Sequence, residues 1–198
     1  MKEEDFPGLF LAADKVAKNY QDKFKLVLKT NLITLVIAAI LSFIPISHWI
    51  IPLLQLLVLL TTLLCSIYLA TQKPEKIWYS GRALAESIKT LTWRYISKAE
   101  PFNNEDKESK SEFIKTLNQA VQQNREVCQN YSNHLGDEQI TKKMIEMRSK
   151  DLKTRQQNYH LYRIKDQNDW YSAKAKYKQG EAFYGMRYGL ALTAIASG

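Results

Sequence analysis

The sequence predicts an all-α membrane protein, a transmembrane helical hairpin with long cytosolic helices, and three observations lead to this prediction. Between Lys29 and Lys73 there is no Asp, Glu, Lys or Arg, and most residues there are Leu, Ile, Val or Ala. The flanking segments carry apolar residues at helical spacing, and no segment alternates with a period of two. Gly and Pro number only seven and five among 198 residues, which disfavours a sheet with many turns.

Residues 1–25 are predicted to form an N-terminal amphipathic helix that leads into the membrane. Its apolar residues recur near helical spacing and are Phe6, Leu9, Leu11, Ala12, Val16, Tyr20 and Phe24.

Residues 26–72 are predicted to cross the membrane twice. One crossing of the hydrocarbon core takes roughly 20 apolar residues. The first crossing is expected over about Leu26–Ile46 and the second over Trp49–Ala70. Pro45 ends the first helix, and Trp49 suits a position at the membrane interface. This long apolar stretch, which starts late in the chain, does not fit a secretory signal.

Basic residues flank both sides of the hairpin and predict its orientation. Lys23, Lys25 and Lys29 precede the first crossing, Lys73 and Lys76 follow the second, and the connecting loop has none. By the positive-inside rule, the N-terminus and the region after the hairpin are both cytoplasmic, so we expect a multi-pass membrane protein.

Residues 73–180 are predicted to form a cytosolic helical region. One helix is expected from Pro74 to about Ser97, and a solvated loop follows at residues 103–109. A second helix is expected over residues 112–134. After a break at residues 135–137, a long helix is expected over residues 138–180, with no breaker before Gly180.

Residues 181–198 are predicted to start a further membrane segment. The residues after Arg187 are uncharged and compatible with a helix. Eleven residues rise only about 16 Å, roughly half the thickness of a bilayer. Either the sequence is truncated here or its end inserts partway, and we favour truncation.

A first patch of aromatic and charged residues is predicted on one face of the helix after the hairpin. Its members are Trp78, Arg82, Glu86, Lys89 and Trp93, spaced four, four, three and four apart. At this spacing Arg82 can pair with Glu86, and Glu86 with Lys89. The patch is either an ion network between packed helices, with the Trp rings as anchors, or a surface that recognises a partner domain or gates the membrane segment.

A second patch with similar composition is predicted further along the chain. Arg163, Asp166 or Gln167, and Trp170 share one helical face, and Lys174 follows them. We expect both patches to mediate helix packing or recognition.

Polar side chains within the predicted crossings are few. Gln55, Thr62 and Ser66 lie on one stripe of the second helix, while Thr34 and Ser42 are eight apart on the first. Because polar groups in hydrocarbon need partners, these five side chains either bond between helices or line an aqueous pore in an oligomer.

The sequence predicts neither an enzyme nor a cofactor. The three His residues are isolated and show no zinc spacing with each other or with either Cys, and no phosphate-binding or hydrolase motif occurs. Cys65 and Cys128 lie in different regions, so no disulfide is expected. The net charge of +8 is assigned to topology and lipid contact, not to nucleic acid. The basic run over residues 142–155 is expected to be a solvated helix face, or else a contact for anionic lipid.

Three groups of residues together resemble a known family. They are Trp78, Tyr79, Gly81, Arg82, Ala83, Ala85, Glu86, Ser87, Lys89, Trp93, Arg94, Tyr95, Glu100, Pro101 and Phe102; then Ile140, Thr141, Met144, Arg148, Leu152, Arg155 and Tyr159; and then Arg163, Ile164, Asp166, Gln167, Trp170, Tyr171, Lys174 and Ala175. The chain is similar to the SLATT superfamily, the SMODS and SLOG-associating two-transmembrane effectors.

The resemblance implies a membrane hairpin flanked by long cytosolic helices, often followed by a second such unit. It implies an effector of a prokaryotic, anti-phage conflict system that forms a homo-oligomer in the lipid bilayer. An upstream sensor or nucleotide-signalling protein would trigger it to permeabilise the inner membrane. The alternative function is a non-conducting membrane anchor or scaffold for a cytosolic partner.

Overall fold

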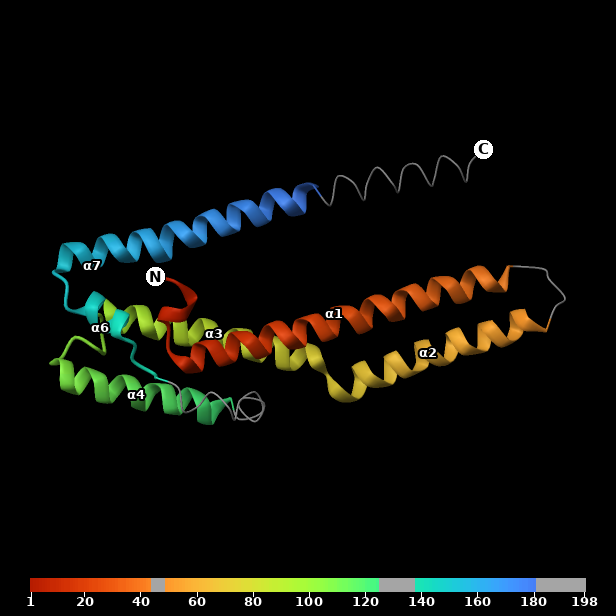
Figure 1. The fold of residues 1–198 in the computed structure, drawn as a ribbon, viewed down its shortest axis with the longest axis horizontal. Helices are drawn as coiled ribbons and strands as arrows, with labels where there is room; N and C mark the ends of the chain where they lie inside the picture. Colours follow the sequence, from red (N-terminus) through yellow and green to blue (C-terminus); the bar gives the residue numbers. More distant parts are fainter. Residues whose placement is uncertain (44–48, 125–137, 181–198) are drawn as a thin grey trace.

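The structure, a computed structural model, describes residues 1–43, 49–124 and 138–180. Within these ranges every regular element is helical, which confirms the all-α prediction. The elements are η1 (Glu3–Asp5), α1 (Gly8–Ser42), α2 (Ile50–Gln72), α3 (Pro74–Ile96), α4 (Asp106–Gln123), α6 (Lys142–Arg148), α7 (Leu152–Tyr159) and the π-helix η2 (His160–Lys165). The helix then continues through residues 166–180. The molecule is elongated, with a two-helix arm at one end and a cluster of helices at the other (Figure 1).

Helix α1 runs without interruption from the helical cluster into the arm (Figure 1). Its 35 residues correspond to about 53 Å of helix. No Gly or Pro lies between Gly8 and Ser42, so nothing in the sequence breaks the helix. The predicted amphipathic helix of residues 1–25 and the predicted first crossing are therefore two parts of one helix.

The arm consists of the second half of α1 packed against α2, which returns toward the cluster. Both helices are long and apolar enough to cross a membrane, and only 6% of the most apolar window in each is buried. The 23 residues of α2 span about 35 Å, which exceeds the hydrocarbon thickness of about 30 Å. Two helices of the length and apolarity predicted for a transmembrane hairpin are thus present.

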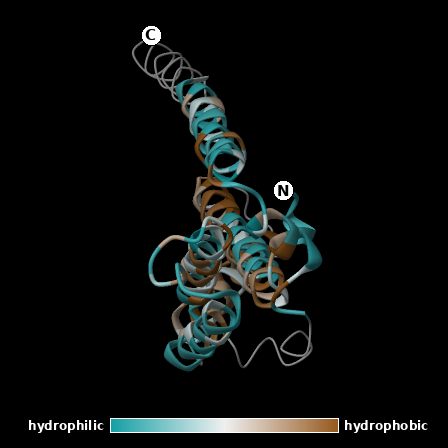
Figure 2. Cartoon of the chain, turned by 90° about the vertical axis from the view of Figure 1, so that its left-hand side faces the viewer, coloured by the Kyte–Doolittle hydropathy of each residue, from teal (hydrophilic) through white to brown (hydrophobic). Residues whose placement is uncertain are grey.

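The cluster forms a core between the start of α1, α3, α4 and α6. Its buried apolar residues include Leu9, Phe10, Ala13, Leu84, Ala85, Ile88, Trp93, Tyr95, Phe102, Phe113, Leu117, Met144 and Met147. Viewed from the cluster end, hydrophilic residues cover much of the outer surface of these helices (Figure 2). The cluster thus has apolar residues inside, the opposite arrangement to the arm.

Small residues let α1 and α3 approach each other closely. A side-chain carbon added at Gly81 of α3 would lie 3.4 Å from the Cβ of Ala17 and 3.5 Å from the carbonyl oxygen of Ala13. Both alanines are buried. The contact therefore brings the start of α3 directly against the α1 backbone.

Helix α4 begins earlier than the sequence predicts. We expected a solvated loop over residues 103–109 and a helix from Glu112, but α4 starts at Asp106. The hydroxyl of Ser109 is buried and donates to the carbonyls of Phe102 and Asn104. Asp106 and Glu108 lie in the first turn, where negative charge is favourable. Only residues 103–105 of the polar run form a loop, and the rest of the run is the start of α4.

The prediction of one unbroken helix over residues 138–180 is wrong. Helix α6 ends at Arg148 and α7 begins at Leu152. Thr141 and Asp151 cap the two helices, because their side chains accept the backbone N–H groups of Met144 and Thr154. The break lets α6 bury its apolar face in the core while α7 runs separately above it (Figure 1).

Three predicted features lie outside the described residues. They are the Pro45 break within residues 44–48, the break at residues 135–137 together with the end of the second cytosolic helix and Cys128, and the membrane segment predicted over residues 181–198.

Candidate functional site

The first patch forms an ion network that ties α3 to α1. The Arg82 guanidinium lies 3.1 Å from a carboxylate oxygen of Asp14 on α1 and 2.9 Å from one of Glu86 on its own helix. The expected pair of Arg82 with Glu86 is therefore present. Its second partner, Asp14, was not recognised from the sequence.

Asp14 is a buried carboxylate whose charge is balanced from two sides. Its residue is 6% exposed, and the Lys18 ammonium lies 2.5 Å from its second oxygen. The hydrogen bond to Asp14 raises the pKa of Lys18 above its ordinary value. A buried carboxylate is tolerated only when it is paired in this way. Helical spacing gave a signal for it, because Asp14 and Lys18 are four apart.

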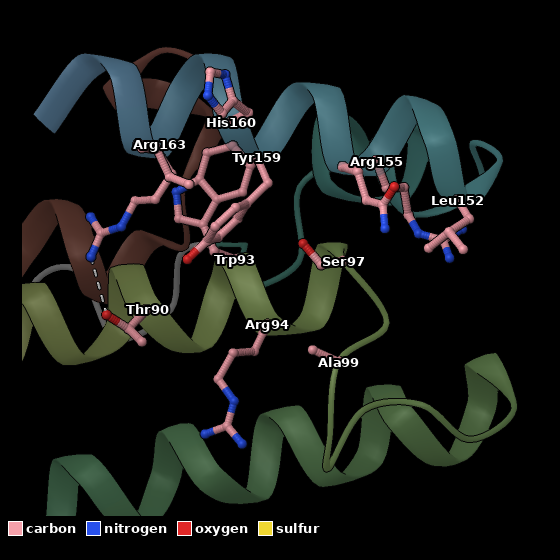
Figure 3. Close-up of a pocket in the computed structure, with 12 residues that line it drawn as sticks. Thr90, Trp93, Arg94, Ser97, Ala99, Leu152, Arg155, Tyr159, His160 and Arg163 are labelled. Atoms are coloured by element: carbon pink, nitrogen blue, oxygen red, sulfur yellow. Dashed lines mark hydrogen bonds between the residues drawn. The ribbon is translucent and has the colours of Figure 1, made fainter. Parts of the chain in front are cut away.

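The second patch meets the first through Arg163. Its guanidinium lies 3.7 Å from Glu86 and donates to the Thr90 hydroxyl at 3.3 Å, as the dashed line in Figure 3 marks. Arg82 and Arg163 thus share the Glu86 carboxylate between them. A chain of charges runs from α1 through α3 to η2.

A cavity of about 380 Å³ separates the two patches. Its lining residues come from three parts of the chain and are Glu3, Phe10, Asp14, Arg82, Glu86, Lys89, Asp166, Gln167, Trp170 and Tyr171. Asp166, Gln167 and Trp170 of the second patch therefore face Arg82 and Glu86 of the first. The Trp170 ring also carries the Lys174 ammonium at 4.4 Å, a cation–π contact.

The aromatic members of the first patch anchor the helix packing at its two ends. The Trp78 ring lies 6.0 Å from that of Phe24 on α1. Trp93, 2% exposed, meets Phe6 at 6.5 Å and the edge of Tyr159 at 5.7 Å.

Lys89 departs from the sequence expectation. We expected it to pair with Glu86, but its ammonium lies 5.7 Å from the centre of the Phe6 ring. Glu86 is shared instead by the two arginines of the network.

The polar residues of the hairpin face each other across the α1–α2 contact. Gln55 donates to the Ser42 hydroxyl at 2.9 Å, and Thr62 donates to the Thr34 hydroxyl at 2.8 Å. Ser66 lies further along α2 and is exposed. In this structure four of the five predicted pore-lining side chains bond between helices, as polar groups in hydrocarbon require. A role in lining a pore stays a prediction.

Arg148 is a structural residue that sequence reasoning assigned wrongly. It was placed in a solvated basic face, but it is 3% exposed. It donates to Asp106 at 2.9 Å, to the Phe102 carbonyl at 3.0 Å and to the Tyr95 carbonyl, and it stacks 4.6 Å from the Tyr95 ring centre. One guanidinium thus fastens α6 to the end of α3 and the start of α4.

A sequence signal for this burial existed. Met144, Met147 and Arg148 occur at the spacing of one helical face, and both methionines are buried. The hydrogen bond from Arg148 lowers the pKa of the Asp106 carboxyl, and the nearby Lys98 adds to this effect. The other basic residues of the run, Lys142, Lys143, Lys150 and Lys153, are exposed and Arg155 is partly buried.

No group of three or more His, Cys, Asp or Glu that could hold a metal ion occurs within residues 1–43, 49–124 and 138–180. The charged groups described above pair with each other, so this arrangement couples helices mechanically.

One protein family matches the chain. The sequence profile described as "SMODS and SLOG-associating 2TM effector domain 3" matches residues 7–156. The match includes the hairpin, the first patch and Arg148, and it ends before the second patch. No curated protein and no solved structure matches the chain.

Proposed function

The chain belongs to the family of SMODS and SLOG-associating two-transmembrane effectors, and we propose that triggered copies of it associate and permeabilise the inner membrane. Membership makes the chain a membrane effector of conflict systems. Pore formation, homo-oligomerisation and the anti-phage role are what the proposal adds.

The hairpin supports the membrane location. Apolar side chains cover the outside of α1 and α2, among them Leu35, Val36, Leu56 and Leu63, each 46% exposed or more. Surfaces of this kind are stable in lipid and not in water. With lysines on both flanks, the proposal places the N-terminus and residues 73–180 in the cytoplasm.

The continuity of α1 is the observation that carries the proposal. The same helix is clamped to α3 through Asp14 and Arg82 and crosses the apolar region up to Ser42. Because a helix is stiff over this length, a shift of its cytosolic part moves its membrane part. A trigger acting on the cytosolic helices therefore has a direct route to the hairpin.

Permeation requires several copies of the chain. Two packed helices leave no central channel, so an aqueous path forms only between hairpins. In such an assembly the Gln55–Ser42 and Thr62–Thr34 bonds would open, and these groups would turn toward water. Because the bonds join uncharged groups, opening them is expected to cost only about 0.6 kcal/mol each.

The test is permeabilisation of bacteria that express the chain with its natural trigger, followed with a membrane-potential dye. The proposal expects depolarisation after triggering, and its loss in the Gln55→Leu/Thr62→Leu/Ser66→Leu variant. A variant with three lipid-facing changes, Leu56→Ile/Leu59→Ile/Leu63→Ile, serves as the matched control and keeps the activity. An unchanged potential after triggering would refute permeabilisation.

A non-conducting anchor is the second candidate, and one observation favours it. Four of the five candidate pore-lining side chains already have hydrogen-bond partners within one chain. An anchor would retain its function in the triple-leucine variant. It would lose its function with Arg82→Ala, which disrupts the cytosolic packing.

The proposal assigns no chemical reaction to the chain. Its partners would be the lipid bilayer, further copies of itself and an upstream sensor or nucleotide-signalling protein. The paired patches on α3 and on the helix after α7 are the proposed surface through which these proteins act.

A further inference from the structure

A second cavity lies between α3 and the helix formed by α7 and η2. Its volume is about 600 Å³, within the range of small-molecule sites, about 300–1,000 Å³. Trp93, Tyr159 and Arg163 point into the space between the two helices in Figure 3. The cavity is separate from the one between the two patches, because the two have no lining residue in common.

Unpartnered hydrogen-bonding atoms gather at this cavity. Six buried side-chain atoms in the described residues have no hydrogen-bond partner, and four of them belong to residues lining this cavity: Trp93 Nε1, Ser97 Oγ, Arg155 Nε and Arg163 Nη1. Of these four, Arg163 Nη1 lies 3.7 Å from a carboxylate oxygen of Glu86, an ion-pair distance too long for a hydrogen bond. Trp93 is 98% buried, since only 2% of it is exposed. Buried polar atoms are rarely left without partners. Three atoms without any partner at one cavity, with the weakly paired Arg163 beside them, indicate a ligand.

All four atoms can donate a hydrogen bond. The indole and the two guanidinium nitrogens are donors only, and the hydroxyl can donate as well. Trp93, in the last turn of α3, and Ser97, its C-cap residue, are four residues apart, and the two arginines of the opposite helix are eight residues apart. The cavity therefore presents donors from both sides, which suits an acceptor-rich group such as a phosphate or carboxylate.

The charges around the cavity favour an anion. Arg155 and Arg163 line it, and none of its twelve lining residues is Asp or Glu. Arg94 is a lining residue too, but its guanidinium points toward α4, away from the α7 side (Figure 3). Arg94 donates to the Glu100 carbonyl, and Arg155 donates with another nitrogen to the Lys150 carbonyl at 2.5 Å. Neither of those bonds neutralises the charge. Arg163 is balanced only in part, because Glu86 is 3.7 Å away and shared with Arg82.

The remaining walls are apolar and aromatic. The ring of Trp93 meets the edge of Tyr159 at 5.7 Å. Leu152 and Ile164 line the cavity on the Tyr159 side. The wall on the α7 side includes the π-helix of residues 160–165, a helix type found frequently at functional sites. A flat apolar group fits such walls.

We propose that this cavity binds a soluble small organic anion, in which a phosphate or carboxylate is attached to a flat apolar body. The donors of Trp93, Ser97, Arg155 and Arg163 hold the anionic group, and the rings and Leu152 contact the body. A lipid headgroup is the wrong source, since Trp93 lies nineteen residues, or about 28 Å of helix, beyond the membrane junction at Pro74. Binding at this cavity stands independently of membrane permeabilisation.

The experiment is calorimetric titration of the full chain in detergent with 1-naphthyl phosphate as the probe. Neutral 1-naphthol and inorganic phosphate are titrated in parallel. Arg155→Gln removes one lining charge, and Lys153→Gln removes one charge from the exposed side of the same helix. Ser97→Ala and Trp93→Phe each remove one donor. Melting temperatures identify any variant that fails to fold.

The expected result is saturable binding of 1-naphthyl phosphate, tighter than that of either parallel compound. Loss of a charged hydrogen bond in Arg155→Gln weakens it at least about tenfold, and Ser97→Ala about threefold to tenfold. Lys153→Gln changes it less than about twofold, because an exposed charge is screened.

Three results would overturn the proposal. One is equal weakening by Arg155→Gln and Lys153→Gln, which reduces the effect to general charge. Another is binding of 1-naphthol or inorganic phosphate as tight as that of the probe. The third is no saturable binding of the probe up to about 1 mM, the weak limit of specific recognition here.

Discussion

The two ends of α1 lie in opposite environments, although they belong to one helix. In the part that packs in the helical cluster Leu9 and Ala13 are 2% and 0% exposed, while Leu35 and Val36 in the arm are 46% and 60% exposed. The charged residue Asp14 is buried in the first part, and in the second Thr34 points inward to Thr62. The same helix is organised for water at one end and for lipid at the other.

This comparison explains why polar groups are placed differently in the two regions. In the core of the helical cluster, the buried charges of Asp14 and Arg148 are paired, and apolar residues fill the interior. In the hairpin, two pairs of hydroxyl and amide groups bond across the contact between the helices, and apolar residues cover the outside. The cluster buries its apolar side chains, which water solvates poorly, and the hairpin pairs its polar side chains, which lipid solvates poorly.

The largest expected effect is in the core of the helical cluster. Arg148→Ala removes one donor each from the Tyr95 and Phe102 carbonyls, which keep only the Lys98 N–H and the Ser109 hydroxyl, and it empties the space of a side chain that is 3% exposed. It should destabilise the cluster by about 3–4 kcal/mol. The measurement is unfolding by denaturant in detergent, with the unfolded fraction detected by limited proteolysis of residues 73–180. Lys150→Ala, two residues away and exposed, is the control and should change stability by less than about 0.5 kcal/mol. Equal losses of stability in the two variants would contradict the role of Arg148 as a buried residue that holds α6 to α3 and α4.

The next effect tests the difference in solvent directly. Leu60 in α2 and Leu161 in η2 are 49% and 48% exposed. Leu60→Arg should cost about 3 kcal/mol of membrane insertion, whereas Leu161→Arg should stay within about 0.5 kcal/mol. Resistance of the membrane-bound fraction to alkaline carbonate measures both. Were both changes tolerated alike, the arm would not lie in lipid.

A smaller effect distinguishes bonded from lipid-facing polar groups in the hairpin. Thr62→Val removes the hydrogen bond to Thr34 and should weaken the helix contact by about 0.6 kcal/mol. The adjacent Thr61, whose hydroxyl donates only to the Leu57 carbonyl of its own helix, provides the matched control. Thr61→Val should leave the hairpin unchanged. Unfolding of the two variants in detergent measures both changes in stability. A larger effect for Thr61→Val would mean that Thr61, and not Thr62, faces α1.

The smallest effect is a dependence on pH. Arg148 holds the pKa of the Asp106 carboxyl below its ordinary value of 3.8, so ionised Asp106 stabilises the folded state. This contribution is complete above the unfolded pKa and disappears as the pH falls through the lower, folded pKa. The stability difference between the parent and Asp106→Asn should therefore be constant near neutral pH and shrink below about pH 4. Glu105→Gln controls for general charge, and a difference that persists in acid would contradict the pairing.

The local features of the chain were largely predictable. The uncharged run between Lys29 and Lys73 led to the hairpin, and Pro74 marked the start of α3 at its observed position. The spacing of Arg82 and Glu86 led to their ion pair. Each of these depends on residues close together in the sequence, where helical geometry fixes which side chains meet.

The predictions were wrong where contacts between distant segments decide the local structure. The helix over residues 138–180 looked continuous because Ser149 to Asp151 carry neither Gly nor Pro, yet it breaks there. The break allows Arg148 to reach α3 and α4, more than forty residues earlier in the chain. The N-caps at Thr141 and Asp151 were local signals that supported it.

By itself, the sequence determined that this protein is helical, that two helices are apolar enough for lipid and that charged faces flank them. These properties follow from composition and from a period of 3.6 residues, which need no knowledge of the fold. Only the tertiary structure decided which charges pair, because Asp14, Arg82, Glu86 and Arg163 come from three separate segments. It also decided where unpartnered donors gather, since a cavity exists only between helices that have already packed.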